Sequence, residues 1–445
     1  MKSWSERVQG AAALLLLTVG GGAFAAPSTD AAMAPTERWR EVPMPPGFQV
    51  VVSEIEGPVF ADAEGRTLYE WPYRKHRVGY TGEPLGTPLC YDDVVTVTGG
   101  YSSPYPAGLV LPDGESRDSC TDRYPPVYAD ANAEPVGDWT IVERRDGTLQ
   151  WAYEEQPLYT SVLDREPGDV LGGRDVIRPP HPFPPGFDVR TTTIGRMLGT
   201  EGGEAVYAHE QDTAEATACT GACLDEFEPI LAPALARAKG EWSILERAPG
   251  QRQWVFRGKP LYIRPTDQRS WSQEGSDAPG WKNVLTQPAP AFPESFTTRT
   301  TIAGEVLADP DGMTIYVYNC REDSSDQLLC DHPTHTQVYR MALCGAGDWT
   351  RCLEYWPYVE AGEDETSPNR SWTIVHVDPR TGRYAQPGDE GAMRVWAYRD
   401  RPVYLFGRDE HPGDVHGGGN GEWRGRENGL YAFWVRNEFF RRTTQ

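Results

Sequence analysis

The sequence lacks the signatures by which most enzymes and membrane proteins are recognised. It contains no G-x-S-x-G elbow, no H-E-x-x-H motif and no P-loop, and no G-x-G-x-x-G opens a helix. No stretch approaches the roughly 20 apolar residues that a membrane-spanning helix needs. Runs rich in lysine and arginine are also missing, and the formal net charge is -23. The sequence therefore predicts a noncatalytic protein with no membrane span, and its charge disfavours nucleic acid as a partner.

A short apolar run near the start predicts export. Lys2 and Arg7 precede the apolar residues 11–19, and Ala23-Phe24-Ala25 forms an A-x-A cleavage site. These features are typical of a secretory signal peptide over residues 1–25, so we expect a periplasmic or secreted protein. Because the first cysteine is Cys90, we expect no lipid anchor behind the cleavage site.

One pattern of aromatic residues occurs three times along the chain. A phenylalanine opens each copy, and a tyrosine follows it 21, 20 and 20 residues later. Further on, a tryptophan is followed 8 residues later by a second tyrosine. Recurrent spacing of this kind predicts tandem structural units. The four landmarks of the three copies are Phe48, Tyr69, Trp151 and Tyr159; Phe187, Tyr207, Trp254 and Tyr262; and Phe296, Tyr316, Trp396 and Tyr404.

The copies predict the domain organisation. Residues 1–25 are the expected signal peptide and residues 26–43 a flexible leader. The three repeats are expected over residues 44–178, 184–286 and 292–440. Proline-rich joints at residues 178–185 and 287–293 separate them, and such segments are stiff spacers that end secondary structure.

Within each copy the periodicity is that of strands. Aromatic and β-branched residues alternate with polar ones around glycine turns, as in residues 58–71, which we expect to form a hairpin around Gly65. Helical periodicity is scarce, and its best example, residues 232–240, is short. The sequence predicts an all-β fold of three tandem modules of short antiparallel strands. It leaves open whether these form a propeller-like ring or a row of small sheets.

These motifs resemble a family of secreted or lipoprotein repeats with the pattern Y-x-(F/W/Y)-x-x-D. The likeness lies in Tyr207-x-His209-x-x-Asp212, and in an aromatic-proline signature that follows a cysteine, as at Cys120 and Tyr124-Pro125. The first copy departs from the pattern because it lacks the aspartate after Trp71. The resemblance implies a fold and export, and it implies no chemistry.

Eight cysteines in an exported protein predict disulfides. Thiolate metal binding is the alternative, with Cys219 and Cys223 as its nearest candidates. Aligning the copies gives the expected pairs Cys90–Cys120, Cys219–Cys223 and Cys344–Cys352, and leaves Cys320–Cys330 as a fourth.

Two groups of side chains are candidate metal ligands. Asp164 and Asp169, like Asp409 and Asp414, lie five residues apart on glycine-containing loops, where their oxygens suit calcium. The alternative is a turn in which these carboxylates accept backbone hydrogen bonds. Histidines of the third copy offer nitrogen ligands for copper or zinc, or are solvated loop residues. The candidate histidines are His332, His335, His411 and His416.

We interpret the chain as an exported, noncatalytic binding or scaffold module at the cell envelope. Most of its 15 tryptophans and 21 tyrosines are expected in the core, and surplus exposed ones would suit an envelope protein or a glycan as partner. The alternative is a periplasmic metal-binding or redox-partner protein that uses the third-copy histidines or the aspartate loops. We predict no cofactor, and the sequence does not predict the oligomeric state.

Overall fold

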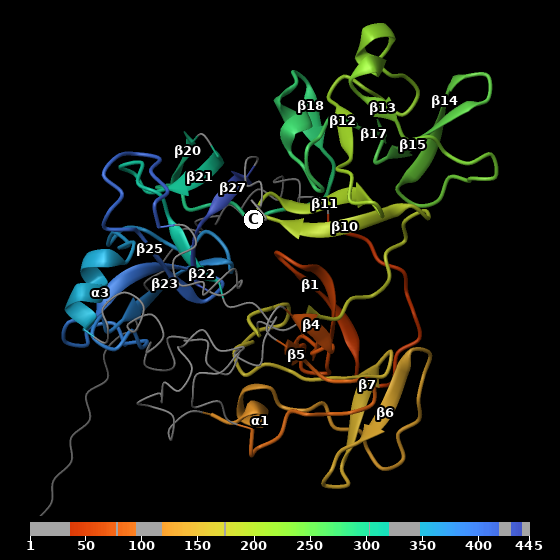
Figure 1. The fold of residues 1–445 in the computed structure, drawn as a ribbon. Coiled ribbons are helices and arrows are strands. Elements are labelled where there is room, and N and C mark those ends of the chain that lie inside the picture. Colours follow the sequence, from red (N-terminus) through yellow and green to blue (C-terminus); the bar gives the residue numbers. More distant parts are fainter. Residues whose placement is uncertain are drawn as a thin grey trace, which may run out of the picture. The chain divides into compact units, whose positions relative to one another are not determined.

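The structure, a computed structural model, describes residues 36–76, 79–94, 118–172, 175–301, 303–319, 348–417 and 429–437. In these ranges the regular secondary structure is nearly all strand, in small sheets whose strands pair antiparallel (Figure 1). The largest sheet has five strands, and no sheet of the described residues closes into a barrel or a propeller. The predicted fold class is confirmed, and of its two arrangements the row of small sheets fits. The boundaries of the repeats stay a prediction.

Each repeat opens with a β-hairpin that begins at or next to its landmark phenylalanine. The register pairs Gln49 with Ala61 in the first repeat and Phe187 with Thr200 in the second. The hairpins are β1 (Gln49–Ser53) with β2 (Gly57–Ala61), β10 (Phe187–Thr192) with β11 (Gly195–Thr200), and β20 (Thr297–Thr301) with β21 (Gly304–Ala308).

The second half of each repeat contains three strands in sequential order. Their last turn has two residues with positive φ, such as Glu154 and Glu155, which is the geometry that the right-handed twist of a hairpin favours. The strands are β6 (Trp139–Glu143), β7 (Leu149–Tyr153) and β8 (Gln156–Pro157); β14 (Trp242–Ala248), β15 (Gln251–Phe256) and β16 (Lys259–Pro260); and β23 (Trp372–Val377), β24 (Met393–Tyr398) and β25 (Arg401–Tyr404).

Short strands around the landmark tyrosines join the two halves. The first tyrosine of each repeat bridges the second, as Tyr207 pairs with Tyr262. These strands are β3 (Tyr69–Glu70), β9 (Asp175–Val176), β12 (Tyr207–His209), β13 (Glu228–Pro229), β17 (Tyr262–Ile263), β18 (Trp281–Asn283), β22 (Tyr316–Asn319) and β26 (Gly429–Ala432). The remaining elements are β4 (Arg74–His76), β5 (Gly79–Thr81), β19 (Leu285–Pro288), β27 (Trp434–Asn437), and the helical turns α1 (Cys120–Arg123), η2 (Gly221–Asp225), η3 (Glu274–Asp277) and α3 (Trp349–Tyr355).

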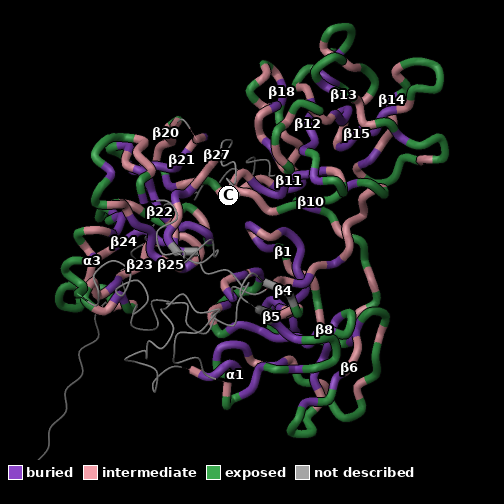
Figure 2. The backbone as a smooth tube through the Cα atoms, in the orientation of Figure 1, coloured by how far each residue is buried: buried purple, intermediate pink, exposed green. Residues whose placement is uncertain are grey.

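The landmark aromatic residues form the cores. In the first repeat the ring of Phe48 lies 4.6 Å from that of Trp139 and 5.7 Å from that of Trp151. The equivalent rings meet in the second and third repeats. Figure 2 shows the buried residues along the strands and the exposed ones along the connecting loops. The constant spacing in the sequence therefore reflects residues that share a core.

Two of the expected disulfides are present among the described residues. Cys90–Cys120 and Cys219–Cys223 each have Cα atoms 5.3 Å apart. Cys352 is also disulfide-bonded. Its expected partner Cys344 lies outside the described residues, as do Cys320 and Cys330.

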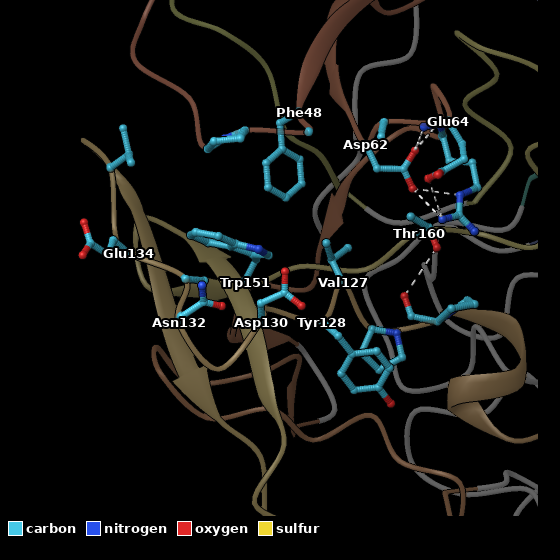
Figure 3. A pocket seen from close by; sticks show the side chains of 18 residues that line it. Phe48, Asp62, Glu64, Val127, Tyr128, Asp130, Asn132, Glu134, Trp151 and Thr160 are labelled. Atoms are coloured by element: carbon cyan, nitrogen blue, oxygen red, sulfur yellow. Dashed lines mark hydrogen bonds and ion pairs between the residues drawn. The ribbon is translucent and has the colours of Figure 1, made fainter.

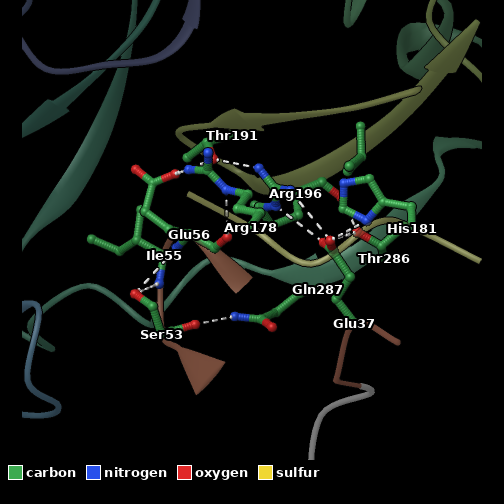
Figure 4. Close-up of polar contacts among 12 residues, drawn as sticks. Glu37, Ser53, Ile55, Glu56, Arg178, His181, Thr191, Arg196, Thr286 and Gln287 are labelled. Carbon is green, nitrogen blue, oxygen red and sulfur yellow. Dashed lines mark hydrogen bonds and ion pairs between the residues drawn. The ribbon is translucent and has the colours of Figure 1, made fainter. Parts of the chain in front are cut away.

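Buried polar contacts tie the end of the predicted leader to the second repeat (Figure 4). Glu37 is fully buried, and its carboxylate accepts hydrogen bonds from Arg196 at 3.0 Å and Thr286 at 2.7 Å. The His181 ring lies 3.1 Å away. Burial alone would raise the pKa of Glu37, but hydrogen bonds from His181 and Arg196 outweigh it and lower the pKa to about 2.

Candidate functional site

A groove of about 800 Å³ lies on the first repeat (Figure 3). It combines three aromatic side chains, three prolines and four acidic residues with one arginine. These are Phe48, Tyr128 and Trp151; Pro46, Pro125 and Pro126; and Asp62, Glu64, Asp130 and Glu134 with Arg66.

Backbone hydrogen bonds hold one wall of the groove in place. This wall is the segment from Pro125 to Val136, which runs beside strand β7. Trp151 donates its backbone N–H to Val127 at 2.8 Å, and Ala129 donates to Leu149 at 2.9 Å. The two prolines at the start of the segment restrict φ further. These bonds and prolines restrict the conformation of the wall, which reduces the entropy that binding costs.

The acidic residues of the groove differ in what they do. Asp62 accepts the side chain of Arg66 at 2.8 Å together with two backbone amides, so its role is to close the turn after β2. Asp130 and Glu134 are exposed, and neither carboxylate has a hydrogen bond or ion pair with any described residue. Tyr128 is 58% exposed beside them. The groove therefore offers two unpaired carboxylates next to an exposed aromatic ring.

The wall segment of the second repeat carries two basic residues that the first repeat lacks. Bridges from Tyr128 to Gln150 and from Leu231 to Gln253 occupy equivalent places and align the two wall segments. In this alignment Glu134 corresponds to Arg237, and Val136 corresponds to Lys239, which bridges Trp242 as Val136 bridges Trp139. The two acidic wall residues of the first repeat thus have no acidic counterpart in the second, whereas the third-repeat wall carries acidic residues of its own, such as Glu363 and Asp364.

The third-repeat candidates for a metal site come together only in part. The Nδ1 atom of His416 lies 3.2 Å from Asp409 and 3.9 Å from Asp414, and that of His411 lies 3.6 Å from Asp414. Within the described ranges no three or more histidine, cysteine, aspartate or glutamate side chains form a group that would hold a metal ion. His332 and His335 lie outside those ranges.

The carboxylates of this loop have structural partners. Asp414 accepts the backbone N–H groups of Glu410 and His411 at 3.0 and 2.9 Å. Asp409 accepts the backbone N–H of His416 at 3.0 Å and the hydroxyl of Tyr316 at 2.6 Å. Such contacts are those of the turn that the sequence offered as the alternative.

A tyrosine–aspartate contact recurs in all three repeats. The buried Tyr69 donates its hydroxyl to Asp164 at 2.7 Å, and the equivalent pairs Tyr207–Asp267 and Tyr316–Asp409 are both 2.6 Å apart. Burial raises the pKa of Asp164 to about 7, although hydrogen bonds from Leu171 and Tyr69 act against this. The first aspartate of each loop therefore anchors the loop to the landmark tyrosine.

Sequence reasoning missed the groove residues Tyr128, Asp130 and Glu134. They lie on a loop between landmarks and belong to no motif. A position-by-position comparison of the first and second repeats would have detected them, because the change from the acidic Glu134 to the basic Arg237 is visible in the sequence.

Comparisons with known proteins give a family match for a limited stretch of the chain. No described helix is long and apolar enough to cross a membrane. No curated protein and no solved structure significantly matches the chain. Residues 140–173, which run from β6 to the loop after Asp164, match the model of a family described as a secreted repeat of unknown function.

Proposed function

We propose that this protein is an exported, noncatalytic binding protein of the cell envelope and that its ligand site is the groove of the first repeat. The observation that carries the proposal is the pair of unpaired carboxylates, Asp130 and Glu134, beside the exposed ring of Tyr128. Exposed aromatic rings and unpaired charges are the groups by which ligand sites orient a partner. An envelope protein or a glycan is the class of partner that fits an exported protein.

Other acidic groups of the described chain support the noncatalytic part of the proposal. Asp164, Asp267 and Asp409 occupy equivalent places and each accepts a tyrosine hydroxyl. A group that recurs in every repeat with the same buried partner has a structural role that explains its position. The groove, by contrast, differs between the repeats, as a ligand site that has diverged would.

Site-specific photo-crosslinking in exporting cells tests this function. A benzophenone amino acid replaces Tyr128, and the matched control carries it at Leu231, which is 59% exposed at the equivalent place of the second repeat. We expect a discrete adduct from position 128 and none from position 231. Digestion of the adduct with a protease or a glycosidase then identifies its class. Equal labelling at both positions, or none at position 128, would refute the proposal.

Metal binding by the third repeat is a second candidate function. It is supported by the approach of His411 and His416 to Asp409 and Asp414. Elemental analysis of the exported protein is the test. Stoichiometric copper, zinc or calcium that disappears in the double variant His411→Gln, His416→Gln would establish it. Metal that stays bound in this variant, or no metal at all, would reject it for these residues.

A further inference from the structure

We propose that the groove of the first repeat binds the guanidinium group of an arginine carried by an extended segment of a basic protein. This inference rests on the proposed function, because it names the ligand of the same groove. It comes from a contact that the second and third repeats make within themselves and that the first repeat lacks.

In the second and third repeats an arginine binds the wall segment from within. Arg252 of β15 donates to the carbonyl oxygens of Pro233 at 2.9 Å and Ala236 at 2.8 Å. Arg394 of β24 donates to the carbonyl oxygens of Gly362 and Glu365. A planar guanidinium with several donors suits such a cluster of carbonyl groups.

The first repeat keeps the loop but not the arginine. The turn is the same in all three repeats. Ala133 donates to the carbonyl of Asp130 at 2.9 Å, Ala236 to that of Pro233 at 2.9 Å, and Glu365 to that of Gly362 at 3.1 Å. The residue that corresponds to Arg252, immediately before the buried glutamine of the strand, is Leu149. No arginine of the described residues donates to the Asp130 carbonyl. The Asp130 carbonyl accepts the N–H of Ala133 and lacks the second, cationic donor that an arginine supplies to the equivalent carbonyl in the other repeats.

The surroundings of this acceptor favour a cation from outside. The Asp130 and Glu134 carboxylates lie on the same loop, and charge-assisted hydrogen bonds to a guanidinium are among the stronger polar contacts. Tyr128, which is 58% exposed, offers a ring face on which a guanidinium stacks. A neutral sugar would leave both carboxylates without a counter-charge.

The rest of the molecule favours a basic protein as the carrier. The net charge of -23 attracts a positively charged partner and raises its rate of association. Prolines at 46, 125 and 126 line the groove, and their fixed φ keeps this surface rigid, which lowers the entropic cost of binding a peptide. In the second repeat Arg237 and Lys239 would repel the same ligand, and in the third Arg394 already donates to the wall carbonyls, so we expect one site per chain.

Fluorescence anisotropy with a labelled peptide of alternating arginine and proline tests the inference. The matched peptide replaces each arginine with citrulline, which has a similar shape and no charge. We expect the full-length protein to bind the arginine peptide at least about tenfold more tightly, and the difference to shrink at high salt. Equal affinity for the two peptides would overturn the inference.

Variants of the groove locate the binding. Leu149→Arg supplies the guanidinium from within, as the other repeats do, and should weaken peptide binding about tenfold, whereas Leu149→Met should not. Asp130→Asn with Glu134→Gln should weaken it as well. The control Glu215→Gln with Glu228→Gln makes the same change in net charge at exposed positions of the second repeat. Unchanged binding by the groove variants, or an equal loss in the control, would overturn the inference.

The two proposals fail separately. Suppose that a chito-oligosaccharide suppresses the adduct at position 128 and the arginine peptide does not. This result would refute the arginine ligand and leave the groove as a ligand site. Absence of both the adduct and peptide binding would refute both. Thermal unfolding of each variant shows whether its fold is intact, and the comparison of the two peptides needs no variant.

Discussion

An arginine–glutamine pair that is buried in the first repeat and partly buried in the second is replaced by two valines in the third. Arg144 donates to the side chain of Gln150 at 2.6 Å, and Arg247 donates to that of Gln253 at 2.8 Å. The register of β23 and β24 puts Val377 and Val395 in the equivalent places, and both are fully buried. The two positions are both polar in the first two repeats and both apolar in the third. This is expected because a buried polar group needs a hydrogen-bond partner.

Breaking the pair should cost more than replacing it. In Arg144→Val the buried amide of Gln150 loses its donor, and we expect the free energy of unfolding to fall by about 3 kcal/mol. The double variant Arg144→Val, Gln150→Val should lose less than the sum of the single variants, by about 1 kcal/mol or more. Urea unfolding of the four proteins measures this coupling. Additive losses would show that the two side chains are independent.

Glu83 shows what the repeat motif could not predict at the level of single residues. The first repeat lacks the motif aspartate, yet its second tyrosine, Tyr159, donates to the fully buried Glu83 at 2.7 Å. In the second repeat Tyr262 donates to the motif residue Asp212 at 3.0 Å. Glu83 also accepts the backbone N–H of Cys90 at 3.0 Å. Both repeats thus have a buried carboxylate that accepts the tyrosine hydroxyl, but it comes from different positions in the chain. A motif with fixed spacing does not reveal such a change.

In each repeat the loop that follows the second landmark tyrosine packs against the ring of the first landmark tyrosine, and a glycine lies at the contact. A Cβ atom at Gly172, Gly275 or Gly417 would lie 2.8, 2.6 or 2.7 Å from the tyrosine ring. The backbone N–H of each glycine also donates to the tyrosine hydroxyl, at 3.2, 3.2 and 3.1 Å. Close approach of the backbone therefore requires glycine at these places.

Gly275→Ala tests this fit. The added methyl group would overlap the ring of Tyr207, and we expect a loss of about 1–3 kcal/mol in the free energy of unfolding. Gly202→Ala in the same repeat is the control, because its Cβ would meet nothing closer than 3.5 Å and its loss should stay within about 0.5 kcal/mol. Equal losses would mean that the ring does not set the requirement.

The elements that the sequence predicted well are those with local partners. The strands that carry Trp139 and Trp151 alternate and pair with each other across a short turn, so their pattern is readable. The hairpin expected over residues 58–71 is only a short pairing, from Ala61 to Thr67, because β2 pairs mainly with β1. Tyr69 then pairs with Tyr159, a contact between residues far apart in the chain that periodicity does not encode.

Across the whole molecule, buried carboxylates respond to pH in opposite senses. The pKa of Glu37 is lowered to about 2, so its contribution to stability is present above pH 4.5 and is lost as the pH falls towards about 2. The pKa of Asp164 is raised to about 7 by burial. The folded state therefore holds a proton on Asp164 between about pH 4 and pH 7, where the unfolded state does not.

Stability should fall as the pH rises through that window. Each pH unit costs at most about 1.4 kcal/mol for one group, and Asp267 and Asp309, whose pKa values are also raised by burial, act in the same sense. Asp164→Asn should make the decline shallower, whereas Asp130→Asn at the surface should not change it. Denaturant unfolding at several pH values between about 4.5 and 7.5 measures both. A variant with the slope of the wild type would contradict this role of Asp164.

The buried position of Glu37 limits how the chain can be divided for study. A fragment that begins at residue 44 omits Glu37 and removes the carboxylate that is hydrogen-bonded to the guanidinium of Arg196, which is only 4% exposed. Solubility trials on such truncations would then report a missing ion pair and not an inability of the second repeat to fold. Expression boundaries upstream of residue 36 avoid that confusion.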